Sequence, residues 1–264
     1  MPTARTLSVL IPCYNEAATI DRTLDAVWAI RDRMALEGLS LQIVAVDDAS
    51  RDGTFERLTA RAGTMPGGTM TVIRHEKNRG KGAAIRSARD KATGDIAIIQ
   101  DADLEYDPKD IAAVIAPIRD GHADAVVGTR FASGTHRVLY FWHRLGNGGL
   151  TFLSNMFTNL NLTDMEVGYK AFNMAAFRLM HLTNDRFGIE PEIVARLSQM
   201  RARVYEVPIS YHGRTYDEGK KITWRDGVAA LFHILRAHFS AAAQPRLLAA
   251  PSPPPALPSA RDSG

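Results

Sequence analysis

Cysteine, long apolar runs and blocks of like charge are all scarce in this chain of 264 residues. The single cysteine, Cys13, excludes an internal disulfide and fits a reducing compartment. Because no apolar stretch is long enough to cross a bilayer and no charged leader precedes an apolar signal core, we expect a cytoplasmic protein. The net charge is only +3, and the basic residues are spread along the chain. This pattern does not favour nucleic acid as a partner.

Two common nucleotide-binding motifs are also missing. No Walker sequence G-x-x-x-x-G-K-[ST] is present, and no G-x-G-x-x-G follows the first predicted strand. The length allows one large domain, which we place at residues 1–240. Residues 241–264 are rich in alanine, proline and serine, and this composition predicts a disordered tail.

What is present is an alternation of apolar strands with helical patterns. In the first half, the pattern predicts strands at 7–12, 41–46, 70–74, 95–100 and 123–127, and helices at 17–36, 53–62, 80–92 and 108–118. In the second half, it predicts helices at 150–160, 190–200 and 224–239 and strands at 168–173 and 203–211. This order predicts an α/β fold with a mostly parallel sheet covered by helices. The apolar face of 224–239 is expected to pack in the core or against a second copy in a homodimer.

Two carboxylates, Asp101 and Asp103, follow the apolar strand 95–100. In extended backbone, residues i and i+2 point to the same side, so both can reach one point. Hard oxygen ligands suit Mg²⁺ or Mn²⁺, which commonly hold phosphates. Taken alone, this motif is better explained as two solvated carboxylates at a turn, because the pattern is short and common.

Polar groups also follow the first two predicted strands, where ligands of parallel sheets usually bind. Tyr14 can stack on a base, and Asn15 or Glu16 can bond to the base edge or the ribose. A capped helix start is the alternative. Asp47 and Asp48 can accept hydrogen bonds from a base or from ribose hydroxyls.

A glycine-led helix start at residues 78–83 carries Lys81, and this arrangement suits a phosphate or a ribose. Ser50 and Asp52 are interpreted as caps of the helix that follows them.

Four motifs in this order resemble the signatures of glycosyltransferase family 2. They are Pro12-Cys-Tyr-Asn-Glu16, Val46-Asp-Asp-Ala-Ser-Arg-Asp-Gly-Thr54, Asn78-Arg-Gly-Lys-Gly82 and Asp101-Ala-Asp-Leu-Glu105. The resemblance covers roughly residues 7–235 and is strongest to the dolichyl-phosphate mannose synthase and polyprenyl-phosphate glycosyltransferase branch. It implies a GT-A fold and metal-dependent, inverting transfer of a hexose from a UDP- or GDP-sugar to a lipid phosphate.

The resemblance also implies residue roles. The family's nucleotide-binding positions correspond to Pro12, Tyr14, Glu16, Asp47 and Asp48 of this chain. Its metal-binding positions correspond to Asp101, Asp103 and Glu105. Glu105 stands where the synthases usually have glutamine. Acceptor-phosphate positions match Arg130 and Arg144, and a basic loop over the diphosphate matches Arg214, Lys220 and Lys221.

The segment 164–172 departs from the synthase pattern and leaves the acceptor open. A hydroxyl acceptor requires a general base, and Asp164, Glu166 and Glu190 are the carboxylates to test. A sugar-phosphate nucleotidyltransferase and a non-catalytic nucleotide-sugar-binding protein are remoter alternatives. The aromatic run 138–142, flanked by basic residues, suits peripheral contact with the inner face of a membrane. An internal acceptor loop, or a helix packed in the core, explains the same run.

Overall fold

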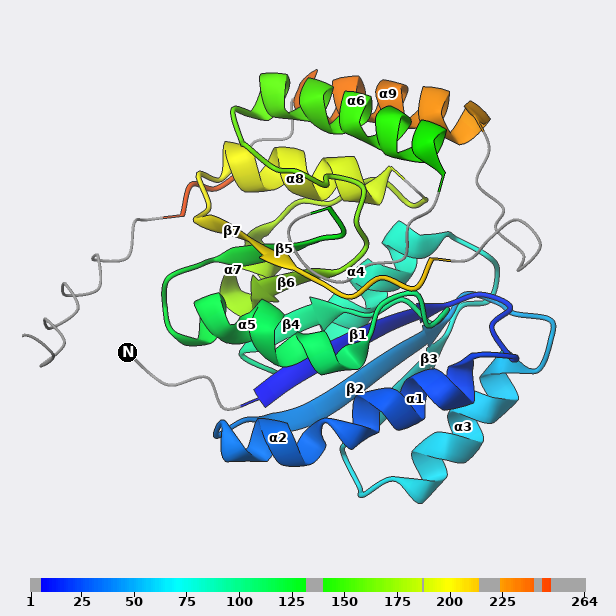
Figure 1. Ribbon diagram of the computed structural model, residues 1–264. Coiled ribbons are helices and arrows are strands. Elements are labelled where there is room, and N and C mark those ends of the chain that lie inside the picture. The colour runs from blue at the N-terminus through cyan, green and yellow to red at the C-terminus, as the bar shows by residue number, and fades with distance from the viewer. Residues whose placement is uncertain (1–5, 132–139, 187, 214–223, 240–243, 248–264) are drawn as a thin grey trace, which may run out of the picture.

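A seven-stranded sheet with helices on both faces forms the body of the molecule (Figure 1). The computed structural model describes residues 6–131, 140–186, 188–213, 224–239 and 244–247, without the side chains of residues 224–226 and 228. The strands are β1 (Thr6–Cys13), β2 (Ser40–Asp47), β3 (Met70–Arg74), β4 (Ile96–Ile99), β5 (Ala125–Thr129), β6 (Lys170–Asn173) and β7 (Val204–Pro208). The helices are α1 (Ile20–Ala29), α2 (Arg31–Leu36), α3 (Thr54–Thr64), α4 (Lys81–Lys91), α5 (Ile111–Arg119), α6 (Phe141–Thr158), α7 (Met174–Leu179), α8 (Ile189–Gln199) and α9 (Trp224–Phe239), with a 3₁₀ turn at Pro108–Asp110.

The strand order is β3-β2-β1-β4-β6-β5-β7, which confirms the predicted α/β class. β6 runs antiparallel to both of its neighbours, and the other described pairs are parallel. The carboxyl ends of β1, β2, β3, β4, β5 and β7 therefore share one edge of the sheet. The turn that leads into β6 lies at the same edge, so residues distant in sequence meet there.

Alternation along the strands builds one core on each face of the sheet. Leu7, Val9 and Ile11 of β1 pack in a cluster with side chains of α1 and α5, whereas Leu10 joins a cluster with α4, α7 and α8. All four side chains are fully buried, as expected for a central strand covered on both faces.

Three elements differ from the sequence prediction. The helix predicted at 17–36 is two helices that meet at Ile30. α6 begins at Phe141, well before the predicted residue 150, because its glycine-containing first half looks like a loop in sequence but continues a helix that packs on α8 and α9. The short helix α7 was not predicted. Its start is capped by Asn173, whose side chain accepts hydrogen bonds from the backbone N–H groups of Ala175 and Ala176.

α6 and α9 lie side by side over α8, away from the sheet (Figure 1). Ile234 and Ala237 of α9 are buried, but Leu231, Phe232 and Phe239 are exposed and therefore lie outside the core of this chain. Contact of these three with a second copy in a homodimer stays a prediction. No helix in the described part of the chain is both long enough and apolar enough to span a membrane.

Part of the predicted tail contacts the domain. The backbone N–H of Leu247 donates to the carbonyl of Met200, and the Gln244 side chain accepts from the N–H of His181. The rest of 241–264 lies outside the described residues.

Candidate functional site

The loops at the carboxyl edge of the sheet hold most of the polar residues singled out from sequence. Three of these loops contain a non-glycine residue in the left-handed region: Asn15 (φ 56°), Ala49 (φ 61°) and Leu104 (φ 64°). Such conformations cost about 1 kcal/mol or more each and cluster at functional sites. The strained loops follow β1, β2 and β4, the strands expected to carry the nucleotide and metal residues.

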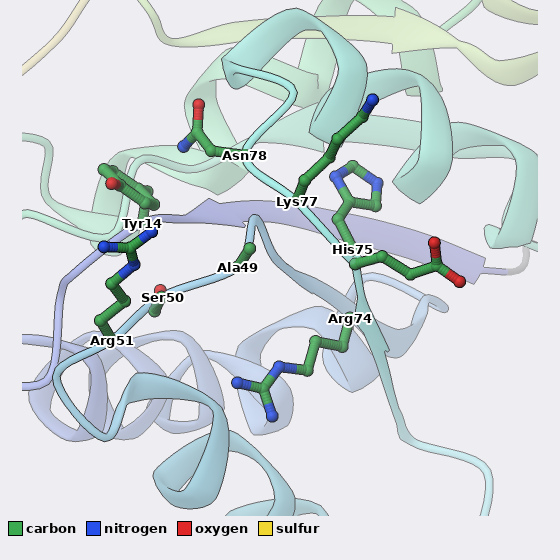
Figure 2. A pocket seen from close by; sticks show the side chains of 9 residues that line it. Tyr14, Ala49, Ser50, Arg51, Arg74, His75, Lys77 and Asn78 are labelled. Atoms are coloured by element: carbon green, nitrogen blue, oxygen red, sulfur yellow. The ribbon is translucent and has the colours of Figure 1, made fainter.

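A pocket of about 470 Å³ opens between the loops that follow β1, β2 and β3. Figure 2 shows its side chains, which are those of Tyr14, Ala49, Ser50, Arg51, Arg74, His75, Glu76, Lys77 and Asn78. Tyr14 is 47% exposed, so its ring is available to a planar ligand such as a base. Pro12 lies near the end of β1, two residues before Tyr14, and pairs with Val46 of β2.

The loops after β1 and β2 are tied together by local hydrogen bonds. The N–H of Asn15 donates to Ser50 Oγ, and its side-chain oxygen accepts from the N–H of Arg51, both at 2.9 Å. Asp52 accepts from the N–H of Ala17 at 2.9 Å. The interpretation of Ser50 and Asp52 as helix caps is therefore incomplete, because the N-cap of α3 is Gly53 and both side chains join the two loops.

Asp47 and Asp48 are both buried and serve different neighbours. The Asp47 carboxylate lies 3.4 Å from Nε of Arg74, a residue that lines the pocket, and accepts from the backbone N–H of Ser50. Asp48 accepts from His75 Nδ1 at 2.6 Å and from the backbone N–H groups of Arg79 and Gly80 at 2.9 and 2.6 Å. Asp48 thus holds the 78–80 turn, and Asp47 joins the ends of β2 and β3. The nucleotide-binding role of both carboxylates stays a prediction.

The glycines at the start of α4 have a packing role. A Cβ on Gly80 would lie 2.4 Å from the carbonyl oxygen of Asp185, and one on Gly82 would lie 2.2 Å from that of Asn184. The same 183–184 segment is held by Glu192, which accepts from the N–H groups of Thr183 and Asn184 instead of capping its own helix. These contacts bring the start of α8 against the start of α4.

Lys81 joins the two carboxylates that this packing brings together. Its Nζ lies 2.8 Å from Asp101 Oδ1 and 2.9 Å from Glu190 Oε1. Burial lowers the pKa of Lys81, but attraction from Asp101 and Glu190 outweighs this and raises it well above the ordinary value. From the sequence, Lys81 was expected beside a phosphate or a ribose and Glu190 was a candidate general base, and their ion pair was not predicted.

The other two predicted metal-binding carboxylates lie in the partly buried loop after β4. Asp103 Oδ1 accepts from the N–H of Glu105 at 3.1 Å, and Glu105 Oε2 accepts from the Tyr211 hydroxyl at 3.0 Å. Among the described residues, no group of three His, Cys, Asp or Glu side chains is placed to hold a metal. Mg²⁺ is commonly bound by one or two carboxylates and completed by substrate phosphates, and this donor set fits such a site.

The predicted acceptor side centres on Arg130, directly after β5. Its guanidinium forms a two-pronged ion pair with buried Asp164, with N···O distances of 2.6 and 2.7 Å. Asn147 of α6 donates to the same carboxylate at 3.1 Å. Asp164 therefore orients Arg130 and neutralises much of its charge.

Two aromatic rings complete the acceptor side. The Phe131 ring lies 5.4 Å from the guanidinium of Arg130 and 4.6 Å from that of Arg144. The Tyr211 ring lies 5.2 Å from Arg130, so Tyr211 contacts the acceptor side and the Glu105 loop at once. The sequence did not identify Phe131 or Tyr211 as site residues. The available signals were that Phe131 follows the predicted site residue Arg130 and that Tyr211 ends a predicted strand.

A turn at residues 164–168 connects the acceptor side with Lys81 and Asp101. A Cβ on Gly168 would lie 2.4 Å from Asp101 Oδ2 and 3.0 Å from Lys81 Nζ. Within the turn, Glu166 is partly buried, and its Oε1 is buried without a hydrogen-bond partner among the described residues. Burial, followed by repulsion from Glu190, raises the pKa of Glu166 to about 7. Buried Lys170 donates to the carbonyls of Met165 and Val167.

The basic residues Arg214, Lys220 and Lys221, predicted to close over a diphosphate, lie outside the described residues. The same applies to residues 138 and 139 of the aromatic run, while residues 140–142 are described at the start of α6 and are exposed.

Several known proteins are similar to this chain. It is 30% identical to glycosyltransferase AglJ of Haloferax volcanii over 81% of its length, and 28% identical to a dolichol-phosphate mannosyltransferase of Pyrococcus furiosus over 81%. The chain spans 65% and 58% of the lengths of these relatives.

Solved structures share the fold at lower identity. Glucosyl-3-phosphoglycerate synthase from Mycobacterium tuberculosis, in complex with Mn²⁺, UDP and phosphoglyceric acid, superposes with a TM-score of 0.67 at 19% identity, covering 89% of this chain and 79% of the synthase chain. Mannosyl-3-phosphoglycerate synthase from Rubrobacter xylanophilus gives 0.65 at 20% identity, covering 88% and 72%. These superpositions confirm the predicted GT-A fold.

The strand-end motifs, the GT-A sheet and the relatives all agree with one family. The model of glycosyl transferase family 2 matches residues 8–181, which is more than half of the chain. The relative from P. furiosus also supports the predicted resemblance to the dolichol-phosphate mannosyltransferase branch. The chain belongs to glycosyl transferase family 2.

Proposed function

We propose that the chain transfers a hexose from a UDP- or GDP-sugar to the phosphate of a polyprenyl- or dolichyl-type lipid, with inversion at the anomeric carbon. The observation that carries this proposal is the placement of Arg130 and Arg144 on one ring, Phe131, beside exposed apolar side chains of α6. Two guanidiniums suit a phosphate, and an adjacent apolar surface suits its lipid. The P. furiosus relative, named as a dolichol-phosphate mannosyltransferase, supports the same acceptor class.

The donor would bind along the other loops of the edge. The pocket beside Tyr14 suits the base, and Asp47 can accept from a base N–H group. Mg²⁺ or Mn²⁺ held by Asp101 and Asp103, with Glu105 close by, would offset charge on the leaving diphosphate. The Mn²⁺ and UDP in the M. tuberculosis synthase support this donor side by fold similarity. Arg214, Lys220 and Lys221 are proposed to contact the same diphosphate.

The reaction needs no general base when the acceptor is a phosphate, because the attacking oxygen is already an anion. Its lone pair forms the new bond to the anomeric carbon as the bond to the diphosphate oxygen breaks, and the diphosphate keeps that electron pair. Arg130 would orient the acceptor phosphate, with Asp164 holding the guanidinium in place. Lys81 would face the leaving group from the start of α4.

The lipid is proposed to contact an apolar face that is formed by side chains of α6 and α9. This face comprises Phe141, Trp142, Leu145, Phe152 and Met156 of α6 and Leu231, Phe232 and Phe239 of α9, all at least 41% exposed. Phe141, Leu145, Phe152 and Met156 recur at helical spacing and so share one side of α6. A helix with apolar side chains along one exposed side is suited to binding at the interfacial region of a bilayer.

A hydroxyl acceptor is the second candidate, favoured by two observations. Asp164 already neutralises Arg130, and the carboxylates of Glu166 and Glu190 lie close enough to interact. The deciding experiment offers polyprenyl phosphate and the matching polyprenol to the enzyme with each labelled nucleotide sugar. The proposal predicts label only in the phosphate lipid, and D164N and E190Q should reduce that transfer without abolishing it. Exclusive labelling of the polyprenol, lost in E190Q, would contradict the proposal and support the hydroxyl acceptor.

A further inference from the structure

The turn at residues 164–168 forms a bridge between the two halves of the site. Asp164, at one end, is ion-paired with Arg130 on the acceptor side. Gly168, at the other end, lies against Asp101 and Lys81 on the donor side. The residue halfway along this bridge, Glu166, therefore lies at the boundary where the transferred group must pass from donor to acceptor.

Hydrogen bonds from buried side chains hold the backbone of this turn on both sides of Glu166. Lys170 Nζ donates to the carbonyls of Met165 and Val167, one on each side of Glu166. The N–H of Gly168 donates to the Tyr106 hydroxyl at 3.1 Å. The backbone of the turn is thus fixed by buried side chains, while the Glu166 side chain takes no part in holding it.

One carboxylate oxygen of Glu166 lacks the partner that a buried acceptor needs. Oε1 is shielded from solvent and accepts no hydrogen bond from any described residue. Leaving a buried acceptor unpaired is unfavourable, and such groups in native proteins are rare enough to require an explanation, a functional role among them. The group that completes this site must donate a hydrogen bond.

The surrounding charges select the kind of donor. Glu166 interacts electrostatically with Glu190 and Asp164, which are acidic, and with Lys170 and Arg130, which are basic and already paired or bonded. Two nearby carboxylates repel a phosphate, whereas a neutral hydroxyl donates to a carboxylate readily. The neutral, hydroxyl-rich part of the proposed reactants is the hexose.

We propose that Glu166 binds a hydroxyl group of the transferred hexose and thereby selects the sugar of the donor. This inference rests on the proposed function, because it assumes a nucleotide sugar between the two half-sites. Glu166 is a substrate-binding residue in this account, with Lys170 positioning its turn.

The experiment compares wild-type enzyme with E166Q, using calorimetry with Mn²⁺ and four probes: UDP, GDP, UDP-glucose and GDP-mannose. The glutamine amide oxygen of this variant can still accept from a hydroxyl but carries no charge, so E166Q should weaken binding of the preferred nucleotide sugar by about tenfold. Binding of the matching nucleoside diphosphate, which lacks the hexose, should stay within twofold. Deoxy analogues of the preferred donor extend the test, because E166Q and wild type should bind with equal affinity the analogue that lacks the hydroxyl partner of Glu166.

The outcomes separate this inference from the proposed function. If neither sugar nucleotide binds the wild type, the proposed function fails and the inference fails with it. If a sugar nucleotide binds and E166Q leaves its affinity unchanged, or weakens the nucleoside diphosphate equally, only the inference is overturned. A purely structural role predicts a lower melting temperature for E166Q with no distinction between the probes, and that result would also overturn it.

Discussion

Gly168→Ala tests how tightly the turn and the predicted metal carboxylate are packed. The added Cβ would lie 2.4 Å from Asp101 Oδ2 and 3.0 Å from Lys81 Nζ. An ordinary contact at this point needs about 3.4 Å or more. The Asp101 carboxylate or the turn must therefore move by about 1 Å, and Asp101 has little freedom because Lys81 holds it at 2.8 Å.

The expected effect is larger on activity than on stability. Overpacking of this kind typically costs about 1–3 kcal/mol of unfolding free energy. A displacement of about 1 Å at a reacting group can reduce turnover by about 100-fold. We therefore expect Gly168→Ala to stay folded at 25 °C but to lose most transfer activity, with a weaker dependence of donor binding on Mn²⁺.

The assay is initial-rate hexose transfer, combined with urea unfolding of the same preparations. Gly63→Ala is the matched control, because a Cβ at Gly63 in α3 meets open space and replaces a poor helix former. That variant should keep wild-type activity and gain up to about 1 kcal/mol. Full activity in Gly168→Ala would refute the placement of Asp101 in the reacting centre.

Three further substitutions probe the charged groups around this turn. In wild type, raising the pKa of Glu166 to about 7 means that the folded state holds its proton longer than the unfolded state, so stability falls as pH rises from about 4.5 to 7. E166Q has no carboxyl group to titrate, so its unfolding free energy relative to wild type should increase by up to about 3 kcal/mol between pH 4.5 and pH 7, measured by urea titration. A difference between the two proteins that does not change with pH would contradict this prediction. Arg130→Lys should reduce transfer at least about tenfold, because lysine cannot form the two-pronged pair with Asp164, and unchanged kcat/KM for the acceptor would argue against the assigned role. Lys81→Met should lower the unfolding free energy by about 3 kcal/mol at pH 7, because it leaves the carboxylates of Asp101 and Glu190 without their ion-pair partner. An unchanged unfolding free energy in urea would show that this cluster is not buried as described.

The sheet and the order of its strand-end motifs were predictable from sequence. Each strand in the first half carries a short apolar run, and Asp47, Asp101 and Arg130 follow such runs directly. Parallel strands bring their carboxyl ends to one edge, so local pattern and topology together place these residues. The antiparallel direction of β6 was not visible, because a four-residue strand carries no signal of direction.

The contacts between half-sites could not be predicted, because they join residues distant in sequence. Lys81 meets Glu190 only because α8 packs on the start of α4 through the 184–185 segment. Tyr211 reaches Glu105 across the sheet edge. Both contacts depend on tertiary packing, which periodicity and local propensity do not encode.

Exposed apolar residues on α6 and α9 were only partly anticipated. Phe152 and Phe232 are 67% and 60% exposed, although helical spacing is usually a sign of a buried face. Liposome flotation separates a membrane face from surface hydrophobicity in general. A double variant with serine at both positions should release the protein from vesicles of anionic phospholipid, whereas Leu36→Ser on distant α2, also exposed, should not.

The central claim is that Asp101 and Asp103 hold a divalent metal that binds the donor diphosphate. Its most direct test is the melting temperature of the wild type and Asp103→Asn with UDP-, GDP- and dTDP-sugars, each with and without Mn²⁺. The account predicts that at least one nucleotide sugar raises the melting temperature of the wild type only when Mn²⁺ is present, and that Asp103→Asn loses this increase. Stabilisation by none of them, or equal stabilisation with and without Mn²⁺, would contradict it.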